Sequence, residues 1–238
     1  MDDTVTSLAD DQNHRAAALS LLDERRAAIA DLGATLRTLI EHATASEVST
    51  EDLRRAAALI REPSALLAER QRTRQQLSSA DDLLAGVRMY NPVGGPGSAL
   101  APPLVVELRD GVAVGTCVLG LAFEGPPTYA HGGVSALLMD QMLGYAIVGA
   151  GHPGMTASLV TDYRAPVPLK TPLRLTAEVT GIDGRKVTAR GTIATAAEPD
   201  RALVEATGLF LALAPEQAQR LFGALVHPDP TDPAVAHD

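Results

Sequence analysis

The segment between His131 and Gly149 constrains the fold more than any other part of this chain. At 3.6 residues per turn, its apolar side chains surround a helix on nearly every side. These side chains belong to Val134, Leu137, Leu138, Met139, Met142, Leu143, Ala146, Ile147 and Val148. A helix that is apolar all round is stable only where the rest of the protein covers it. The fold must therefore enclose one long helix.

The segments on either side of this helix have the pattern of strands. Two runs, 104–108 and 112–122, precede it and flank a hairpin turn at Arg109–Gly111. Four more follow it, at 155–165, 173–182, 186–197 and 202–213. A strand pair, one buried helix and a four-strand meander predict an α+β domain. In it, a mainly antiparallel sheet curls around the helix.

Glycine and proline divide the chain near residue 87. Residues 1–86 hold only two of the 20 Gly and one of the 16 Pro, so we expect helices there. The predicted divisions are a helical extension at 1–86, a Pro/Gly-rich linker at 87–103, the α+β domain at 104–214, and a short helix with a tail at 215–238.

Two or three helices are predicted in the extension. The first covers about 14–43, the second is capped by Ser49 or Thr50, and a third follows Pro63 and runs to about residue 77. The apolar stripe from Ile29 to Ile40 is too narrow to form a core alone, so we expect it to pack onto the α+β domain. A helical hairpin, an extended dimerising arm and a partly disordered tail all fit this pattern.

Charge and cysteine content exclude several classes of protein. The chain has 20 basic and 29 acidic residues, a net charge of -9, which argues against a nucleic-acid binder. The single cysteine, Cys117, excludes an intrachain disulfide and a multi-cysteine zinc site, and its apolar strand predicts an inert core thiol. We also expect no metal, no cofactor and no membrane partner. An acidic start without an apolar run favours a cytoplasmic protein.

The sequence His131-Gly132-Gly133 stands where the central helix should begin. The first N–H groups of a helix have no partners within the helix, and its dipole places partial positive charge at that end. Glycines there let another molecule approach the backbone closely. We therefore expect an anion site, which accepts either a phosphate or the oxyanion formed from a thioester carbonyl.

Asp140 is a carboxylate on an otherwise apolar helix. An unpaired buried charge is costly, so Asp140 should either have polar partners in a structural role or line a cavity. It lies eight residues after Gly132, which is about 12 Å along a helix. One chain cannot direct both residues at the same carbonyl. If both act in one site, a second copy must supply one of them, as in a two-fold homodimer.

Three motifs carry a resemblance to a known family. They are Gly125-Pro126-Pro127-x-x-Ala130-His131-Gly132-Gly133 with Asp140 seven residues later, Gly154-Met155-Thr156, and Tyr163-Arg164-Ala165-Pro166-Val167-Pro168. Over 104–214 the chain resembles the hotdog-fold acyl-CoA thioesterases of the PaaI-like thioesterase superfamily. The resemblance implies a hotdog fold and hydrolysis of a fatty or aromatic acyl-CoA in a homodimer or tetramer.

The resemblance also implies a role for each matching residue. Asp140 corresponds to the catalytic acid, acting as general base on water or as nucleophile. The Gly132 N–H corresponds to the oxyanion donor, with Gly133 beside it in substrate binding. His131 corresponds to the histidine near the thioester carbonyl and sulfur. Thr156 corresponds to the residue that holds the lytic water.

One position departs from the family pattern, and two cations extend it. Relatives often carry Asn six residues before the histidine, where this chain has Gly125. Arg164 and Lys170 lie near predicted strand ends, where we expect them to meet the phosphates of coenzyme A. The alternative functions are a non-catalytic acyl-CoA sensor and a hotdog dehydratase or hydratase. The acidic residues 1–86 disfavour DNA contact by such a sensor, and the His and acid patterns of the dehydratases are not found.

Overall fold

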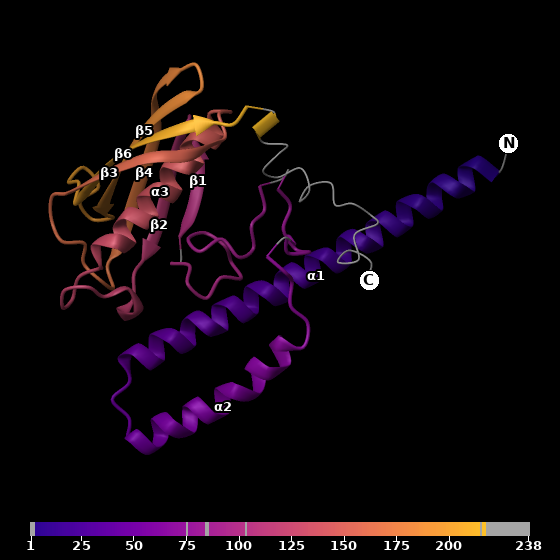
Figure 1. The fold of residues 1–238 in the computed structure, drawn as a ribbon, viewed down its shortest axis with the longest axis horizontal. Coiled ribbons are helices and arrows are strands. Elements are labelled where there is room, and N and C mark those ends of the chain that lie inside the picture. Colours follow the sequence, from indigo (N-terminus) through magenta and orange to yellow (C-terminus); the bar gives the residue numbers. More distant parts are fainter. Residues whose placement is uncertain (1–2, 75, 84–85, 103, 215, 218–238) are drawn as a thin grey trace.

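The computed structural model describes residues 3–74, 76–83, 86–102, 104–214 and 216–217. Two long helices precede a sheet that wraps around a third (Figure 1). The elements are α1 (Asp3–Ala45), α2 (Thr50–Ala68), β1 (Val105–Arg109), β2 (Val112–Val118), the 3₁₀ helix η1 (Leu121–Phe123), α3 (Gly132–Gly149), β3 (Gly154–Tyr163), β4 (Pro172–Asp183), β5 (Lys186–Thr195) and β6 (Val204–Ala212). Most of the predicted 215–238 lies outside the described residues.

The six strands form one antiparallel sheet in the order β1-β2-β4-β5-β6-β3. Helix α3 contacts five of them, β2 to β6, because the sheet curves around it (Figure 1). This is the α+β hotdog arrangement that the sequence predicted, and the order of the strands along the chain is also as predicted. β3 is an outer strand of the sheet, so one of its edges has no neighbouring strand in this chain.

The core forms between α3 and the inner face of the sheet. Alternate residues of β4 point inward, and Leu173, Leu175 and Ala177 are buried there while their neighbours face outward. Facing them on α3 are side chains that are fully buried: Leu138, Met139, Met142, Leu143, Ala146 and Ile147. Burying one such Leu, Ile or Met side chain contributes roughly 1.5–3 kcal/mol. The core therefore rests on aliphatic and methionine side chains, as expected from a chain with 3% aromatic residues.

Glycines on three strands let α3 sit close to the sheet. A Cβ at Gly115 would lie 2.8 Å from the Met142 sulfur, and one at Gly191 would lie 2.6 Å from the Met139 methyl carbon. Gly208 on β6 faces α3 in the same way, since its Cβ would lie 3.0 Å from a methyl of Leu143. Met139, Met142 and Leu143 of α3 therefore fill space left by glycines on the sheet.

One side of α3 stays uncovered in the single chain. Leu137 and Val148 are 39% and 57% exposed, and Asp140, on the same side, is half-buried. The prediction that the chain would bury every side of this helix is therefore wrong for this side. The physical reason is that the sheet curls around only part of the helix circumference, leaving an exposed line along it.

Helix α1 packs on the segment before the hotdog domain, and at its end on η1, through a line of residues spaced four apart. Ile29 is buried in a small apolar cluster with Ala80 and Met89. Gly33 presses against the backbone of 96–97, where a Cβ would lie 2.4 Å from the Pro96 oxygen. These two contacts are made with the end of the extension and with the linker, not with the domain at 104–214 that the stripe was predicted to pack onto.

Two charged residues complete that contact line. Arg37 Nη1 donates to the carbonyls of Pro96 at 2.9 Å and Ser98 at 2.8 Å. The Glu41 carboxylate accepts the N–H groups of Leu121 at 3.1 Å and Ala122 at 3.2 Å, at the start of η1. Helix α1 is thus bonded directly to the segment that leads into α3.

Other predictions about the extension were wrong. Leu32 and Leu39, which belong to the predicted packing stripe, are exposed, because glycine and polar side chains make the contact instead. Pro63 lies inside α2, which continues to Ala68. Proline lacks an N–H and so removes one helical hydrogen bond, but here it does not end the helix. No helix is present in the described residues between 69 and 80.

We predict that Gly33→Ala lowers the melting temperature by about 2–4 °C or more, although alanine ordinarily stabilises a helix interior relative to glycine by about 1 kcal/mol. The added methyl has no space against the Pro96–Gly97 backbone, so α1 must shift away. Thermal unfolding followed by circular dichroism measures the effect. The control is Thr38→Ala, at an exposed position of the same helix, which should leave the melting temperature unchanged or slightly higher. A stabilising Gly33→Ala would contradict this packing.

Candidate active site

The loop between η1 and α3 is closed by its own hydrogen bonds. The Thr128 N–H donates to the Glu124 carboxylate at 2.8 Å, and the Gly125 N–H donates to the Tyr129 carbonyl at 2.9 Å. The His131 N–H donates to the Phe123 carbonyl at 2.9 Å. The loop therefore delivers the chain to the start of α3 in a fixed orientation.

Gly125 has no space for a side chain in this loop. A Cβ there would lie 2.7 Å from the His131 Cα and 3.1 Å from the His131 backbone nitrogen. Where relatives often carry Asn, this chain therefore brings its backbone directly against His131. The departure noted in the sequence has a steric basis, because an Asn at this position would require the loop to move.

His131 is the N-cap of α3. Its Nδ1 accepts the N–H of Gly133 at 3.0 Å, so in its neutral form the ring carries its proton on Nε2. The Gly132 N–H has no acceptor among the described residues, while the Gly132 carbonyl accepts the Tyr163 hydroxyl at 3.0 Å. At this helix end, the N–H of Gly132 is therefore available and that of Gly133 is occupied.

Asp140 and Thr156 are in direct contact. The Thr156 hydroxyl on β3 donates to Asp140 Oδ1 on α3 at 2.8 Å. The pairing of β3 with β6 is irregular between Thr156 and Ser158, and such β-bulges commonly redirect a side chain beside a functional site. The expectation that Asp140 has a polar partner is met, although Asp140 is half-buried rather than buried.

The two predicted phosphate contacts differ in their surroundings. The Arg164 Nε donates to Glu205 at 2.7 Å, and Asp162 lies 3.7 Å from its guanidinium. These carboxylates, Glu205 first, raise the pKa of Arg164 above its ordinary value. Lys170 is exposed, with a left-handed backbone (φ 52°), and it has no ion pair within the described residues. Lys170 is thus the freer of the two cations.

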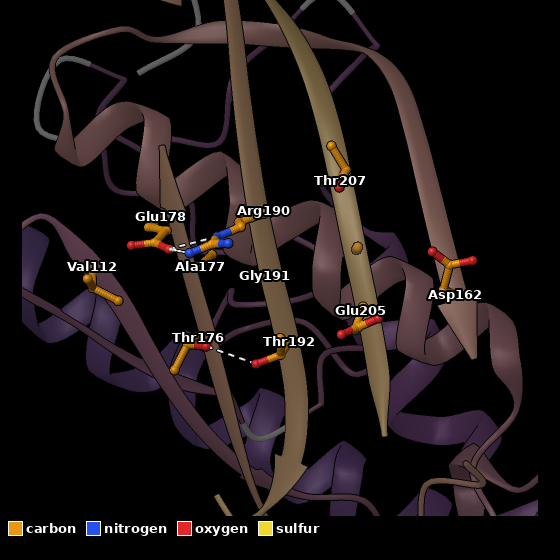
Figure 2. Close-up of a pocket in the computed structure, with 11 residues that line it drawn as sticks. Val112, Asp162, Thr176, Ala177, Glu178, Arg190, Gly191, Thr192, Glu205 and Thr207 are labelled. Atoms are coloured by element: carbon orange, nitrogen blue, oxygen red, sulfur yellow. Dashed lines mark hydrogen bonds and ion pairs between the residues drawn. The ribbon is translucent and has the colours of Figure 1, made fainter. Parts of the chain in front are cut away.

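A depression of about 410 Å³ lies elsewhere, on the sheet face that points away from α3. Figure 2 shows its polar floor, where the Thr176 and Thr192 hydroxyls are 3.0 Å apart and Arg190 pairs with Glu178. None of the residues predicted to act on a thioester lines it. The chemistry therefore points to the α3 side of the sheet and not to this depression.

Two contacts at the site were not predicted from the sequence. The Tyr163 hydroxyl fixes the Gly132 carbonyl, although Tyr163 was noted only as part of a strand-end motif. Glu41 holds η1 from 80 residues away, and no local pattern marks a charged residue on a helix as the acceptor of distant backbone N–H groups. Both depend on tertiary structure.

Comparison with known proteins bears on this geometry. A family model described as "Thioesterase superfamily" matches residues 128–199, the segment that contains His131, Asp140 and Thr156. The crystal structure of a thioesterase superfamily protein is similar to this chain at 37% identity and a TM-score of 0.69, covering 77% of this chain and 94% of that one. The chain belongs to the thioesterase superfamily. The resemblance drawn from the sequence is thereby confirmed at the level of this superfamily.

This thioesterase superfamily member is also similar to curated relatives. The acyl-coenzyme A thioesterase THEM4 of Xenopus laevis is 38% identical over 97 residues, 40% of this chain and 43% of the relative. The enzyme of the same name from Mus musculus is 35% identical over 98 residues, 41% and 42% of the two chains. The match spans less than half the length of these relatives.

The described residues provide neither a grouped set of metal ligands nor a helix suited to span a membrane. In that part of the chain, no three or more His, Cys, Asp or Glu side chains are grouped so as to hold a metal ion. None of the helices described there combines the length and the hydropathy needed to cross a bilayer.

We predict that Cys117 does not react with thiol reagents in the folded protein at pH 8. Burial raises the pKa of this thiol from 9.0 to about 12, so only about one Cys117 in ten thousand is a thiolate at that pH. A thiol titration should count almost no reactive thiol in the native protein and one per chain in denaturant. Rapid labelling of the native protein would show that β2 opens readily.

Proposed function

We propose that this chain hydrolyses acyl-CoA thioesters to a free carboxylic acid and coenzyme A. The observation that carries the proposal is the Asp140 carboxylate on the uncovered side of α3, oriented by the Thr156 hydroxyl. Membership of the thioesterase superfamily and the names of the curated relatives support it. The available N–H of Gly132 supplies a donor for a developing oxyanion.

The roles follow from the hydrogen bonds. Thr156 occupies Asp140 Oδ1, which leaves the second carboxylate oxygen for the reaction. As a general base, that oxygen takes a proton from a water, whose oxygen bonds to the thioester carbon. As a nucleophile, it bonds to the carbon itself and forms an anhydride that water later cleaves. In both cases the C–S bond breaks and the sulfur leaves as a thiolate that then takes a proton.

His131 and Gly132 act on the oxygen of the substrate carbonyl and on the neighbouring sulfur. The Gly132 N–H donates to the oxyanion while Tyr163 holds the Gly132 carbonyl from behind. Because Nδ1 of His131 is occupied by Gly133, its Nε2–H is the group that is free to face the carbonyl or sulfur. Gly133 then contributes to substrate binding through its small size, while its N–H remains hydrogen-bonded to Nδ1 of His131.

The separation of Gly132 and Asp140 requires two copies of the chain. These residues are about 12 Å apart along α3, too far for both to contact one carbonyl. Asp140 lies on the uncovered line of α3 and contacts Thr156 of β3, an outer strand with one unpaired edge. On β3, Met155, Val160 and Tyr163 are exposed apolar residues. We therefore assign this side to the interface of a homodimer with two shared sites, and two such dimers would form a tetramer.

Lys170 is the favoured contact for the phosphates of coenzyme A, because its ammonium has no competing carboxylate in the described residues. Arg164 would have to leave Glu205 to make such a contact. The proposed substrate is thus an acyl-CoA whose phosphates contact Lys170.

We predict that Asp140→Asn lowers kcat for acyl-CoA hydrolysis by about a hundredfold or more, because the amide neither takes a proton nor attacks a carbonyl. Initial rates of thiol release across a chain-length series of acyl-CoAs provide the measurement. The matched control is Asp110→Asn in the β1–β2 turn, where Asn also accepts the positive φ of 51°. Near wild-type turnover by Asp140→Asn would place the chemistry elsewhere. Binding without turnover by the unchanged protein would favour an acyl-CoA sensor.

We predict that two inactive variants complement each other. Gly132→Pro removes the N–H, and the backbone suits it because His131 is extended (φ -62°, ψ 134°) and proline is accepted at the first helical position. Mixing it with Asp140→Asn, after subunit exchange, should restore up to about a quarter of wild-type activity, since half the dimers are mixed and each has one intact site. No recovery despite proven exchange would contradict shared sites.

A further inference from the structure

Helix α2 has a broad apolar face that nothing in the described chain covers. None of its residues is buried, and Leu53, Ile60 and Leu67 are 48%, 41% and 51% exposed. Leu59 and Leu66 widen the same face. Most of the stability of a helix in a protein comes from packing of its apolar face, so a face of this kind ordinarily packs against another element.

The apolar face is symmetric about Ile60. Leu53 and Leu67 lie seven residues before and after it. The small or compact residues that surround the centre lie three and four residues away on both sides: Ala56, Ala57, Pro63 and Ser64. A helix with this pattern matches itself when a second copy runs antiparallel, because Leu53 of each copy then meets Leu67 of the other. A self-matching pattern of this kind fits a two-fold contact.

The charges of α2 favour a copy of itself over a lipid surface. Its charged residues are Glu51, Asp52, Arg54, Arg55, Arg61 and Glu62, three acids and three bases. Interfacial helices that bind anionic membranes carry more Lys and Arg than acids on the polar face. In α2 the basic and acidic residues are equal in number. A balanced face also lets two copies approach without net repulsion.

We propose that α2 is a self-association surface, which pairs antiparallel with α2 of a second copy across a two-fold axis at Ile60. This contact is separate from the proposed dimer interface on α3 and β3, and it does not depend on acyl-CoA hydrolysis. Figure 1 shows α2 held away from the sheet, on the far side of α1, where a second molecule can reach it. Two kinds of two-fold contact on one chain build an assembly larger than a dimer.

Disulfide trapping in the full-length protein tests the pairing, because Cys117 is buried and leaves an introduced cysteine as the reactive thiol. Ile60→Cys should form a covalent dimer under mild oxidation, since the two Ile60 positions meet at the axis. Leu53→Cys alone should not, because its two copies would lie 14 residues, about 21 Å, apart along the helices, beyond the reach of a disulfide. Leu53→Cys mixed with Leu67→Cys should crosslink.

Arg61→Cys is the control on the charged face of the same helix, and it should stay uncrosslinked. The products are read on a denaturing gel after free thiols have been blocked. In analytical ultracentrifugation, Ile60→Asp should raise the dissociation constant of the largest assembly by about tenfold or more. The reason is that it places a charge in the α2–α2 contact.

Several outcomes would overturn the proposal. These are an uncrosslinked Ile60→Cys, equal crosslinking of all four single variants, or an intrachain bond between cysteines at Leu39 and Ala56, which would show α2 closing onto its own α1. Flotation of the protein with phosphatidylserine vesicles, abolished by Ile60→Asp, would assign the face to a membrane. Thiol reactivity at Ile60→Cys that rises only when 218–238 are deleted would assign it to that segment.

Discussion

The structure depends on the burial of one apolar helix in a sheet built to receive it. Met139, Met142 and Leu143 of α3 enter space left by Gly115, Gly191 and Gly208, so the shape of the sheet and the side chains of the helix fit each other. Because the sheet covers only part of α3, the same arrangement leaves one line of the helix open. Asp140 lies on that line, so the packing that makes the core also sets the position of the candidate site.

Most of the hotdog domain could be predicted from the sequence, because its two periodicities are strong and local. Alternation in 173–182 and the all-round apolar pattern of 134–148 each follow from the side-chain spacing of a strand or a helix. The extension could not be predicted as well. Its contact line uses Gly33, Arg37 and Glu41, none of which is apolar, so a search for a hydrophobic stripe selects Leu32 and Leu39 instead.

The candidate site shows the same division. Asp140 and Thr156 stand out because each interrupts or follows a recognisable motif, and the structure places them in hydrogen-bond contact. Which backbone N–H groups have a hydrogen-bond acceptor could not be predicted from the sequence. The His131 ring accepts the N–H of Gly133 and leaves the N–H of Gly132 available. Which of the two is accepted depends on the rotation of the His131 side chain, which sequence spacing does not specify. The steric meaning of Gly125 likewise appears only when His131 lies against it.

The contact of Glu41 with η1 has a consequence for how this fold is inherited and recombined. The family model matches 128–199, yet two backbone donors seven and six residues before that segment rely on an acceptor from α1. A gene fragment encoding only the hotdog strands would leave those donors to water and free the loop that precedes His131. The unit that evolution can move intact is therefore larger than the segment that the family model matches. In this chain, helix α1 has become part of the hotdog scaffold.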